Sequence, residues 1–251
     1  MKGAPSRGLA LATAAVIAAA PGSARARTPP PAVPVPAHAR AGLVDVSTAI
    51  ETDARYATAR NFTGAVLPGY CEPRVLLLAR TARRLALVDR DLGRRLGLGL
   101  KVFDGYRPVR ATRAMVRWAE RTGNRRLLDG GYIARRSSHN LGTSVDLTLV
   151  DQSRRHRELD MGTPYDAFTP SSSTLAARGR VLRNRLTLKR AMERHGFRNY
   201  AREWWHYDSL RPGPRRLDVP IGIAPPGSRS SPPGCPTIAR SSAARPGTIG
   251  R

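Results

Sequence analysis

The sequence predicts an α+β fold. Residues 74–96 carry apolar side chains at steps of three and four, which is typical of a helix that buries one face. In residues 98–104, Leu100 and Val102 alternate with smaller or polar residues, and residues 145–150 are rich in branched side chains, so both segments are expected to be strands. These segments do not follow the regular strand–helix–strand order of a parallel sheet, so a mixed domain is favoured.

Three further elements are expected along the chain. A helix over residues 109–122 follows a proline and ends at Gly123. A second helix over residues 180–195 ends at Gly196. Residues 197–207 then return as a strand.

Composition divides the chain into four parts. Residues 1–26 have a basic start, a short apolar run and a small-x-small site, which predicts a secretory signal peptide cleaved near Ala26 and an exported protein, periplasmic or extracellular. Residues 27–40 are expected to be an extended Pro-rich linker, residues 41–223 one folded domain, and residues 224–251 a disordered tail. No stretch of the mature chain is long and apolar enough for a transmembrane span.

The chain is strongly basic, with a formal net charge of +25 and a pI of about 11.6. The basic residues are mostly arginines scattered through the chain, without a nucleic-acid-binding motif, so no specific nucleic-acid partner is expected. An exported protein of this charge would be attracted non-specifically to an anionic cell envelope.

Only two cysteines occur, Cys71 and Cys235. They form no C-x-x-C pair, so a cysteine zinc site is not expected. A disulfide that ties the tail to the domain and a pair of free thiols are both compatible with the sequence.

Two short segments carry the residue types of a zinc site. The first contains His139 and Asp146, and the second contains Glu203 and His206. Two imidazoles and one carboxylate can hold Zn²⁺ with three protein ligands, leaving a fourth position for water and a free glutamate beside it.

The spacing supports convergence only in part. His139 precedes a Leu-Gly step that can turn tightly, and Asp146 lies on the strand that follows, so both side chains can reach one point. Glu203 and His206 are three residues apart, and a regular strand would point them to opposite faces. Their segment must therefore bulge or bend if both serve one site.

The pattern S-x-H-x-x-G-x-x-x-D followed by E-x-x-H resembles the zinc D,D-peptidase family that cuts D-alanyl-D-alanine peptides. Further ordered matches over roughly residues 44–221 resemble its D-alanyl-D-alanine dipeptidase branch, of the vancomycin-resistance type. Ser144 departs from the family, which usually has alanine there. The resemblance implies a small antiparallel sheet flanked by helices. The ordered matches are Tyr56-Ala57-Thr58, Asn61-Phe62-Thr63-Gly64, Asp104-Gly105-Tyr106-Arg107-Pro108, Met161-Gly162 with Asp166, and Glu203-Trp204-Trp205-His206-Tyr207.

The resemblance also implies roles at the reacting centre. His139, Asp146 and His206 would hold one zinc ion as cofactor, and Glu203 would be the general base that activates water. Arg107 would stabilise the oxyanion of the tetrahedral intermediate.

Four residues would bind the substrate. Asp166 resembles the family acid that meets the free ammonium group of a dipeptide, and a buried carboxylate needs such a cationic partner. Ser137, Ser138 and Tyr56 are expected to hold the two ends of the substrate, although hydroxyl groups in turns also bond to local backbone.

The expected function is therefore zinc-dependent hydrolysis of D-alanyl-D-alanine to two D-alanines, with the small D,D-dipeptide as partner. One alternative is a D,D-carboxypeptidase that trims peptidoglycan stem peptides. A second is a non-catalytic, basic cell-wall-binding protein that keeps zinc as a structural element.

Overall fold

The computed structural model describes residues 37–223 and 233–235. The predicted signal peptide, most of the linker and most of the tail lie outside these residues, and those expectations stay predictions. Helix α1 (Ala37–Arg40) occupies the end of the predicted linker, where we expected an extended chain. Among the described residues, no helix is both long and apolar enough to cross a membrane.

The main sheet has the strand order β2-β4-β5-β8-β7, and β6 pairs with one end of β5. Neighbouring strands run antiparallel except for the short parallel pair β2–β4. This mostly antiparallel sheet, combined with helices, confirms the α+β class. The bounds are β2 Glu51–Thr52, β4 Leu98–Asp104, β5 Ser144–Asp151, β6 Arg157–Glu158, β7 Phe197–Asn199 and β8 His206–Ser209.

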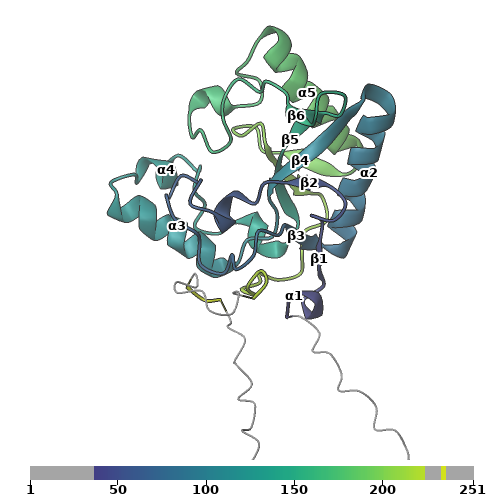
Figure 1. Ribbon diagram of the computed structural model, residues 1–251. Helices are drawn as coiled ribbons and strands as arrows, with labels where there is room; N and C mark the ends of the chain where they lie inside the picture. The colour runs from purple at the N-terminus through teal and green to yellow at the C-terminus, as the bar shows by residue number, and fades with distance from the viewer. Residues whose placement is uncertain (1–36, 224–232, 236–251) are drawn as a thin grey trace, which may run out of the picture. The chain divides into compact units, whose positions relative to one another are not determined.

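Helices pack on the sheet through their apolar faces. Helix α2 (Ala79–Leu96) buries Leu85, Val88 and Leu92, and it lies with α5 (Gly179–Arg194) on one side of the sheet (Figure 1). Two more helices, α3 (Val109–Arg121) and α4 (Arg126–Asp129), lie on the other side (Figure 1). Three short 3₁₀ helices complete the helical elements: η1 Arg55–Ala57, η2 Ser138–Leu141 and η3 Pro170–Ser172.

The predicted start of the first long helix is wrong. Residues 76–78 form strand β3, which pairs with β1 (Leu43–Asp45), and the helix begins at Ala79. Leu76 and Leu77 are completely buried. Adjacent side chains of a strand point to opposite faces, so both faces of β3 are covered at these two residues.

The single strand predicted over residues 197–207 is also wrong. The chain forms β7, turns, and returns as β8, which begins at His206. The side-chain amide of Asn199 donates hydrogen bonds to the carbonyl oxygens of Glu203 (3.0 Å) and His206 (3.1 Å) and so holds the turn together. This turn removes the opposite-face problem, because Glu203 lies in the loop and His206 on the strand.

A glycine makes the connection into β5 tight. Gly142 follows η2 in the left-handed conformation, with a φ of 67°. A β-carbon at this position would lie 2.8 Å from Leu43 Cδ2, which is too close for any side chain without local movement. The predicted turn between His139 and the strand that carries Asp146 is therefore present.

The two cysteines form a disulfide. Cys71 and Cys235 are bonded, with their α-carbons 5.5 Å apart, and this bond attaches residues 233–235 to the domain. The backbone amide of Gly69 also donates to the carbonyl oxygen of Pro233, and Arg110 donates to that of Gly234. Of the two possibilities left open by the sequence, the structure has the cross-link.

Candidate metal and substrate site

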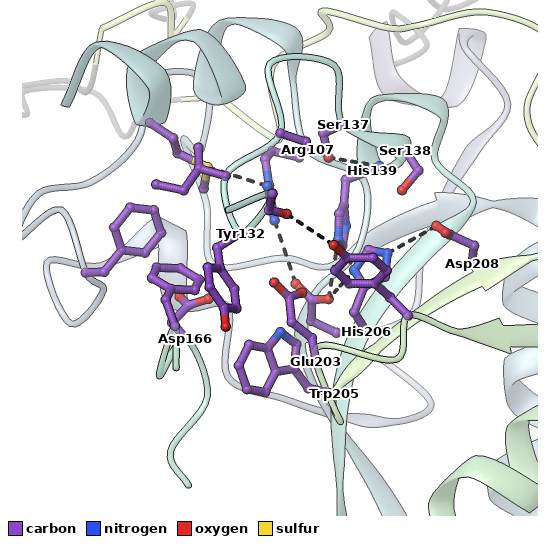
Figure 2. A pocket seen from close by; sticks show the side chains of 18 of the residues that line it. Arg107, Tyr132, Ser137, Ser138, His139, Asp166, Glu203, Trp205, His206 and Asp208 are labelled. Carbon is purple, nitrogen blue, oxygen red and sulfur yellow. Dashed lines mark hydrogen bonds and ion pairs between the residues drawn. The ribbon is translucent and has the colours of Figure 1, made fainter. Parts of the chain in front are cut away.

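A cavity of about 290 Å³ opens beside β5 and β8 (Figure 2). This volume is at the small end of the range of ligand pockets, which suits a small molecule. The cavity brings together all the residues with a predicted site role, from six separate segments of the chain. They are Tyr56, Arg107, Ser137, Ser138, His139, Asp146, Asp166, Glu203 and His206.

Three side chains in the cavity form a compact set of metal-binding donors. Asp146 and His206 are direct cross-strand neighbours on β5 and β8, and His139 reaches them from η2. His139 Nε2 lies 3.1 Å from His206 Nδ1 and 3.3 Å from Asp146 Oδ1, and His206 Nδ1 lies 2.9 Å from Asp146 Oδ1. Donor atoms bound tetrahedrally to zinc at about 2.0–2.1 Å lie roughly 3.3 Å from each other, so the set fits this ion.

Each imidazole is oriented by an acceptor on its other nitrogen. His139 Nδ1 donates to the carbonyl oxygen of Gly105 at 2.6 Å, and His206 Nε2 donates to Asp208 Oδ1 at 3.2 Å. In the neutral rings, the two nitrogens that face each other therefore carry no hydrogen. Two such lone pairs repel unless a cation lies between them, and outer-shell acceptors of this kind are typical of histidine metal ligands.

The charge around the donors also favours a cation. Asp104, Asp146 and Glu203 are buried, and Asp166 is half-buried, whereas of the two arginines that line the cavity, Arg107 and Arg136, the second is exposed. Uncompensated buried carboxylates are costly, so this side of the cavity is suited to a positive ion and a cationic ligand.

Arg107 is held rigidly at the end of β4. Its Nε and Nη2 donate to Asp104 Oδ2 at 3.0 and 2.8 Å, and its guanidinium carbon lies 4.9 Å from the ring centre of Tyr56. Tyr70 donates to the other oxygen of Asp104 at 2.6 Å. Nη2 of Arg107 is 3.7 Å from Asp146 Oδ2, so the cation faces the donor set.

Glu203 faces the same space from the opposite side to Arg107 (Figure 2). The turn between β7 and β8 buries its side chain, which is 7% exposed. Burial raises the pKa of Glu203 to about 7. A carboxyl group that gains and loses a proton near neutral pH is suited to general acid–base chemistry.

Asp166 occupies an unusual backbone conformation, with a φ of 61°. Non-glycine residues at positive φ are uncommon, and such strain is concentrated at functional sites. The hydroxyl group of Tyr56 hydrogen-bonds to the Asp166 carboxyl group, at 3.0 Å from Oδ2. Burial, together with the charge of Asp146, raises the pKa of Asp166 well above its usual value, so the group is ready for a cationic partner.

The two serines differ in their contacts. Ser137 Oγ accepts from the backbone amide of His139 at 3.2 Å and caps η2, so it already has the local backbone role that was the alternative to substrate binding. Its hydroxyl hydrogen is still available to a ligand. Ser138 lies beside Asp208 at the edge of the cavity (Figure 2).

Sequence reasoning missed several residues of the site. Asp208 orients His206, and Ser144 donates to the same Asp208 oxygen at 2.6 Å. A signal was present, because residues two apart on a strand share a face. Asp104 holds Arg107 by hydrogen bonds. Tyr165 contacts Asp146, which lies 19 residues earlier in the chain, and no local sequence pattern indicates this contact.

A His-Asp-His donor set with a buried glutamate and an arginine beside it, in an α+β domain, defines a metallohydrolase of the zinc-peptidase type. Residues 39–217 match the Peptidase_M15 family, described as D-ala-D-ala dipeptidase, and the chain belongs to this family.

Relatives of this chain are named for the same activity. A D-alanyl-D-alanine dipeptidase of Enterococcus faecium is 34% identical over 181 residues, covering 66% of this chain and 88% of its own length. One of Streptomyces coelicolor is 34% identical over 179 residues, covering 65% and 87%. One of Escherichia coli is 33% identical over 166 residues, covering 63% and 78%.

A solved structure is also similar, but more distantly. It is a crystal structure of a mutant of the vancomycin resistance D,D-pentapeptidase VanY in complex with Zn(II). The TM-score is 0.34 at 16% sequence identity, over 55% of this chain and 74% of that one. At this score the similarity carries no argument for the present fold.

Proposed function

We propose that this protein hydrolyses D-alanyl-D-alanine to two D-alanine molecules in a zinc-dependent reaction. The observation that carries the proposal is a small cavity that contains the His-Asp-His donor set, Glu203, and Asp166, whose carboxyl group is suited to bind an ammonium group. The family and the relatives, which are named for this dipeptidase activity, support the same substrate.

The metal would be held by His139 Nε2, His206 Nδ1 and Asp146 Oδ1, the three atoms that converge in the structure. Zinc with three protein ligands acts as a Lewis acid and lowers the pKa of a water that it coordinates to about 7. Gly105 and Asp208 keep both imidazoles in the tautomer that presents a lone pair to the ion.

Glu203 would move the proton during peptide cleavage. Its ionised carboxylate takes a proton from the attacking water, and the protonated form then gives it to the amine of the leaving D-alanine. The raised pKa of about 7 suits both steps, because the group must hold the proton only transiently.

Arg107 would donate to the carbonyl oxygen as negative charge develops on it. The pair of hydrogen bonds to Asp104 fixes the guanidinium before substrate arrives, so little reorganisation is needed in the transition state. A preorganised donor of this type contributes a factor of about 10²–10³ to the rate.

Asp166 would select substrates with a free amino group. The ammonium group of a dipeptide supplies the positive charge that this enclosed carboxyl group lacks, and Tyr56 orients the carboxyl group toward it. An N-acylated peptide would bring a neutral amide to the same place, which leaves the carboxylate unpaired. This feature favours a dipeptidase over a carboxypeptidase acting on stem peptides.

The test compares D-alanyl-D-alanine with its N-acetylated form as substrates of the zinc-loaded protein. We expect release of D-alanine from the free dipeptide and a loss of kcat/KM by roughly 10–100-fold for the blocked form, the scale of a lost hydrogen bond between charged groups. Efficient cleavage of the blocked form would instead support the carboxypeptidase. Wall binding without any hydrolysis would support the non-catalytic protein.

We also propose that the protein is exported. Residues 1–26 have the pattern of a secretory signal peptide, and the Cys71–Cys235 disulfide is of a kind that persists in oxidising compartments. N-terminal sequencing of the protein recovered from the culture medium or periplasm is expected to start at Arg27. Recovery of uncleaved protein in the cytosol alone would contradict this proposal.

The net charge of +25 supports weak, non-specific association with an anionic cell envelope after export. Because the attraction is between exposed charges, it is expected to weaken steeply between 50 and 500 mM salt (roughly a threefold fall in Debye length). Binding of the protein to purified cell walls across this salt range tests the proposal, and binding that is insensitive to salt would contradict it.

A further inference from the structure

A chain of hydrogen-bonding groups connects the ammonium-binding carboxyl group to the metal-binding donors. Asp166 accepts from Tyr56, whose hydroxyl oxygen lies 2.9 Å from that of Tyr165. The hydroxyl group of Tyr165 in turn lies 3.0 Å from Asp146 Oδ2. Of these four groups, Tyr165 is therefore the one that contacts both a predicted zinc ligand, Asp146, and the partner of the ammonium-binding carboxyl group, Tyr56.

The ring of Tyr165 is fixed by packing and not by these hydrogen bonds. It stacks on Phe103, with ring centres 4.7 Å apart at 24°, and meets the edge of Trp205 at 5.6 Å. The residue is 9% exposed. A phenylalanine at this position would keep these contacts, so removal of the hydroxyl group isolates its role from that of the ring.

The hydroxyl group determines how Asp146 presents its two oxygens. Oδ1 points to the nitrogens of His139 and His206, whereas Oδ2 is held by Tyr165 and faces Arg107 at 3.7 Å. Without an anchor on Oδ2, the carboxylate could rotate about its terminal bond, which has a broad torsional preference. An outer-shell hydrogen bond that fixes a ligating carboxylate strengthens metal binding.

The same hydroxyl group holds Tyr56 in place. Tyr56 has a single hydrogen, and the carboxyl group of Asp166 is its strongest acceptor. The oxygen of Tyr56 is thereby free to accept, and the single hydrogen of Tyr165 is shared between this oxygen (2.9 Å) and Asp146 Oδ2 (3.0 Å). Loss of this contact would loosen the partner of Asp166 without touching Asp166 itself.

We propose that Tyr165 is a positioning residue that aligns the zinc ligand Asp146 and, through Tyr56, the ammonium subsite at Asp166. The part of this inference that concerns the dipeptide rests on the proposed function, whereas the part that concerns the metal does not. Tyr165 is not among the residues that line the cavity, so it would act through its two neighbours, Asp146 and Tyr56.

The test measures two affinities for Tyr165→Phe. Zinc affinity is measured by competition with a chelating dye, with zinc alone as the probe. Dipeptide affinity is measured by calorimetry with D-alanyl-D-alanine on the zinc-loaded protein, in a Glu203→Gln background that prevents turnover. We expect zinc affinity to fall by about 10-fold and dipeptide affinity by a similar factor, the size of one lost hydrogen bond in a charged network.

Two further variants separate positioning from a general structural effect. Tyr56→Phe removes the contacts of its hydroxyl group to Asp166 and Tyr165 but leaves the hydrogen bond from Tyr165 to Asp146, so it is expected to weaken dipeptide binding and leave zinc affinity within about twofold. Tyr207→Phe is the matched control, because Tyr207 is another buried tyrosine whose hydroxyl group has no hydrogen-bond partner in the described part of the chain. Both affinities of this control are expected to be unchanged.

The result that would overturn the inference is a Tyr165→Phe protein with the zinc affinity of the wild type. Equal losses of zinc affinity in Tyr165→Phe and Tyr207→Phe would also overturn it, since any buried tyrosine would then have the same effect. Failure of the proposed function gives a different result. The wild-type protein would then bind zinc but neither bind nor cleave the dipeptide, and the zinc comparison between variants would still decide the role of Tyr165.

Discussion

Asp208 provides a sharp test of how the donor set is built. Its Oδ1 accepts from His206 Nε2 at 3.2 Å and from Ser144 Oγ at 2.6 Å, so this one oxygen fixes the ring that presents Nδ1 to the metal. Asp208→Ala removes the acceptor and its charge. Asp208→Asn removes the charge but keeps an oxygen at the same place.

The expected magnitude follows from the position of Asp208. Loss of an outer-shell partner costs about 10–100-fold in metal affinity. The Asp208 side chain is 34% exposed, so solvent screens part of its charge and the lower end of this range applies. We therefore expect Asp208→Ala to weaken zinc binding by about 10-fold, or about 1.4 kcal/mol, and Asp208→Asn by a smaller factor of about 3.

The assay is zinc competition with a chelating dye at constant pH and ionic strength. Asp151→Asn is the matched control, because Asp151 lies at the far end of β5 with a side chain that is similarly exposed, at 29%. The control should bind zinc like the wild type. If Asp208→Ala also binds zinc like the wild type, the hydrogen bond from His206 to Asp208 does not orient the imidazole for metal binding, and this explanation is refuted.

Three other predictions concern the substrate, the general base and the disulfide. Asp166→Asn should raise KM for D-alanyl-D-alanine. It should also lower the ratio of kcat/KM for the free dipeptide to kcat/KM for its N-acetylated form, measured in steady-state assays of both substrates; an unchanged ratio would contradict the role of Asp166. Activity should fall with decreasing pH as Glu203, whose raised pKa is about 7, becomes protonated. Because bound zinc lowers the pKa of a nearby carboxyl group, this acid limb of the kcat/KM profile should lie below pH 7, and a flat profile from pH 8 to 5 would argue against Glu203 as the base. Replacing Cys71 and Cys235 together by alanine should lower the free energy of unfolding by about 2–5 kcal/mol in urea titrations, since the bond closes a loop of 164 residues, and it should leave zinc affinity unchanged because neither cysteine lines the cavity.

The parts of the site that the sequence predicted depend on short-range geometry. His139 and Asp146 are joined by a turn at Gly142 and one strand, so their convergence follows from local backbone preferences. Asp208 lies on the same face of β8 as His206 and was within reach of the same reasoning.

The parts that were mispredicted depend on contacts between distant segments. Residues 76–78 became a strand because β1 was available to pair with them, and no periodicity within the segment indicates this. The turn before His206 depends on the Asn199 side chain, which can be seen only once β7 and β8 are paired. The contact between Tyr56 and Tyr165 joins residues 109 positions apart.

The central claim is that one zinc ion, held by His139, Asp146 and His206, is required to cleave the dipeptide. The most direct measurement is D-alanine release from D-alanyl-D-alanine by chelator-treated protein, titrated with zinc. A single catalytic site predicts no release without metal, a linear rise up to one equivalent of zinc, and then a plateau. Release that persists after the metal is removed, or no release at any zinc concentration, would contradict the claim.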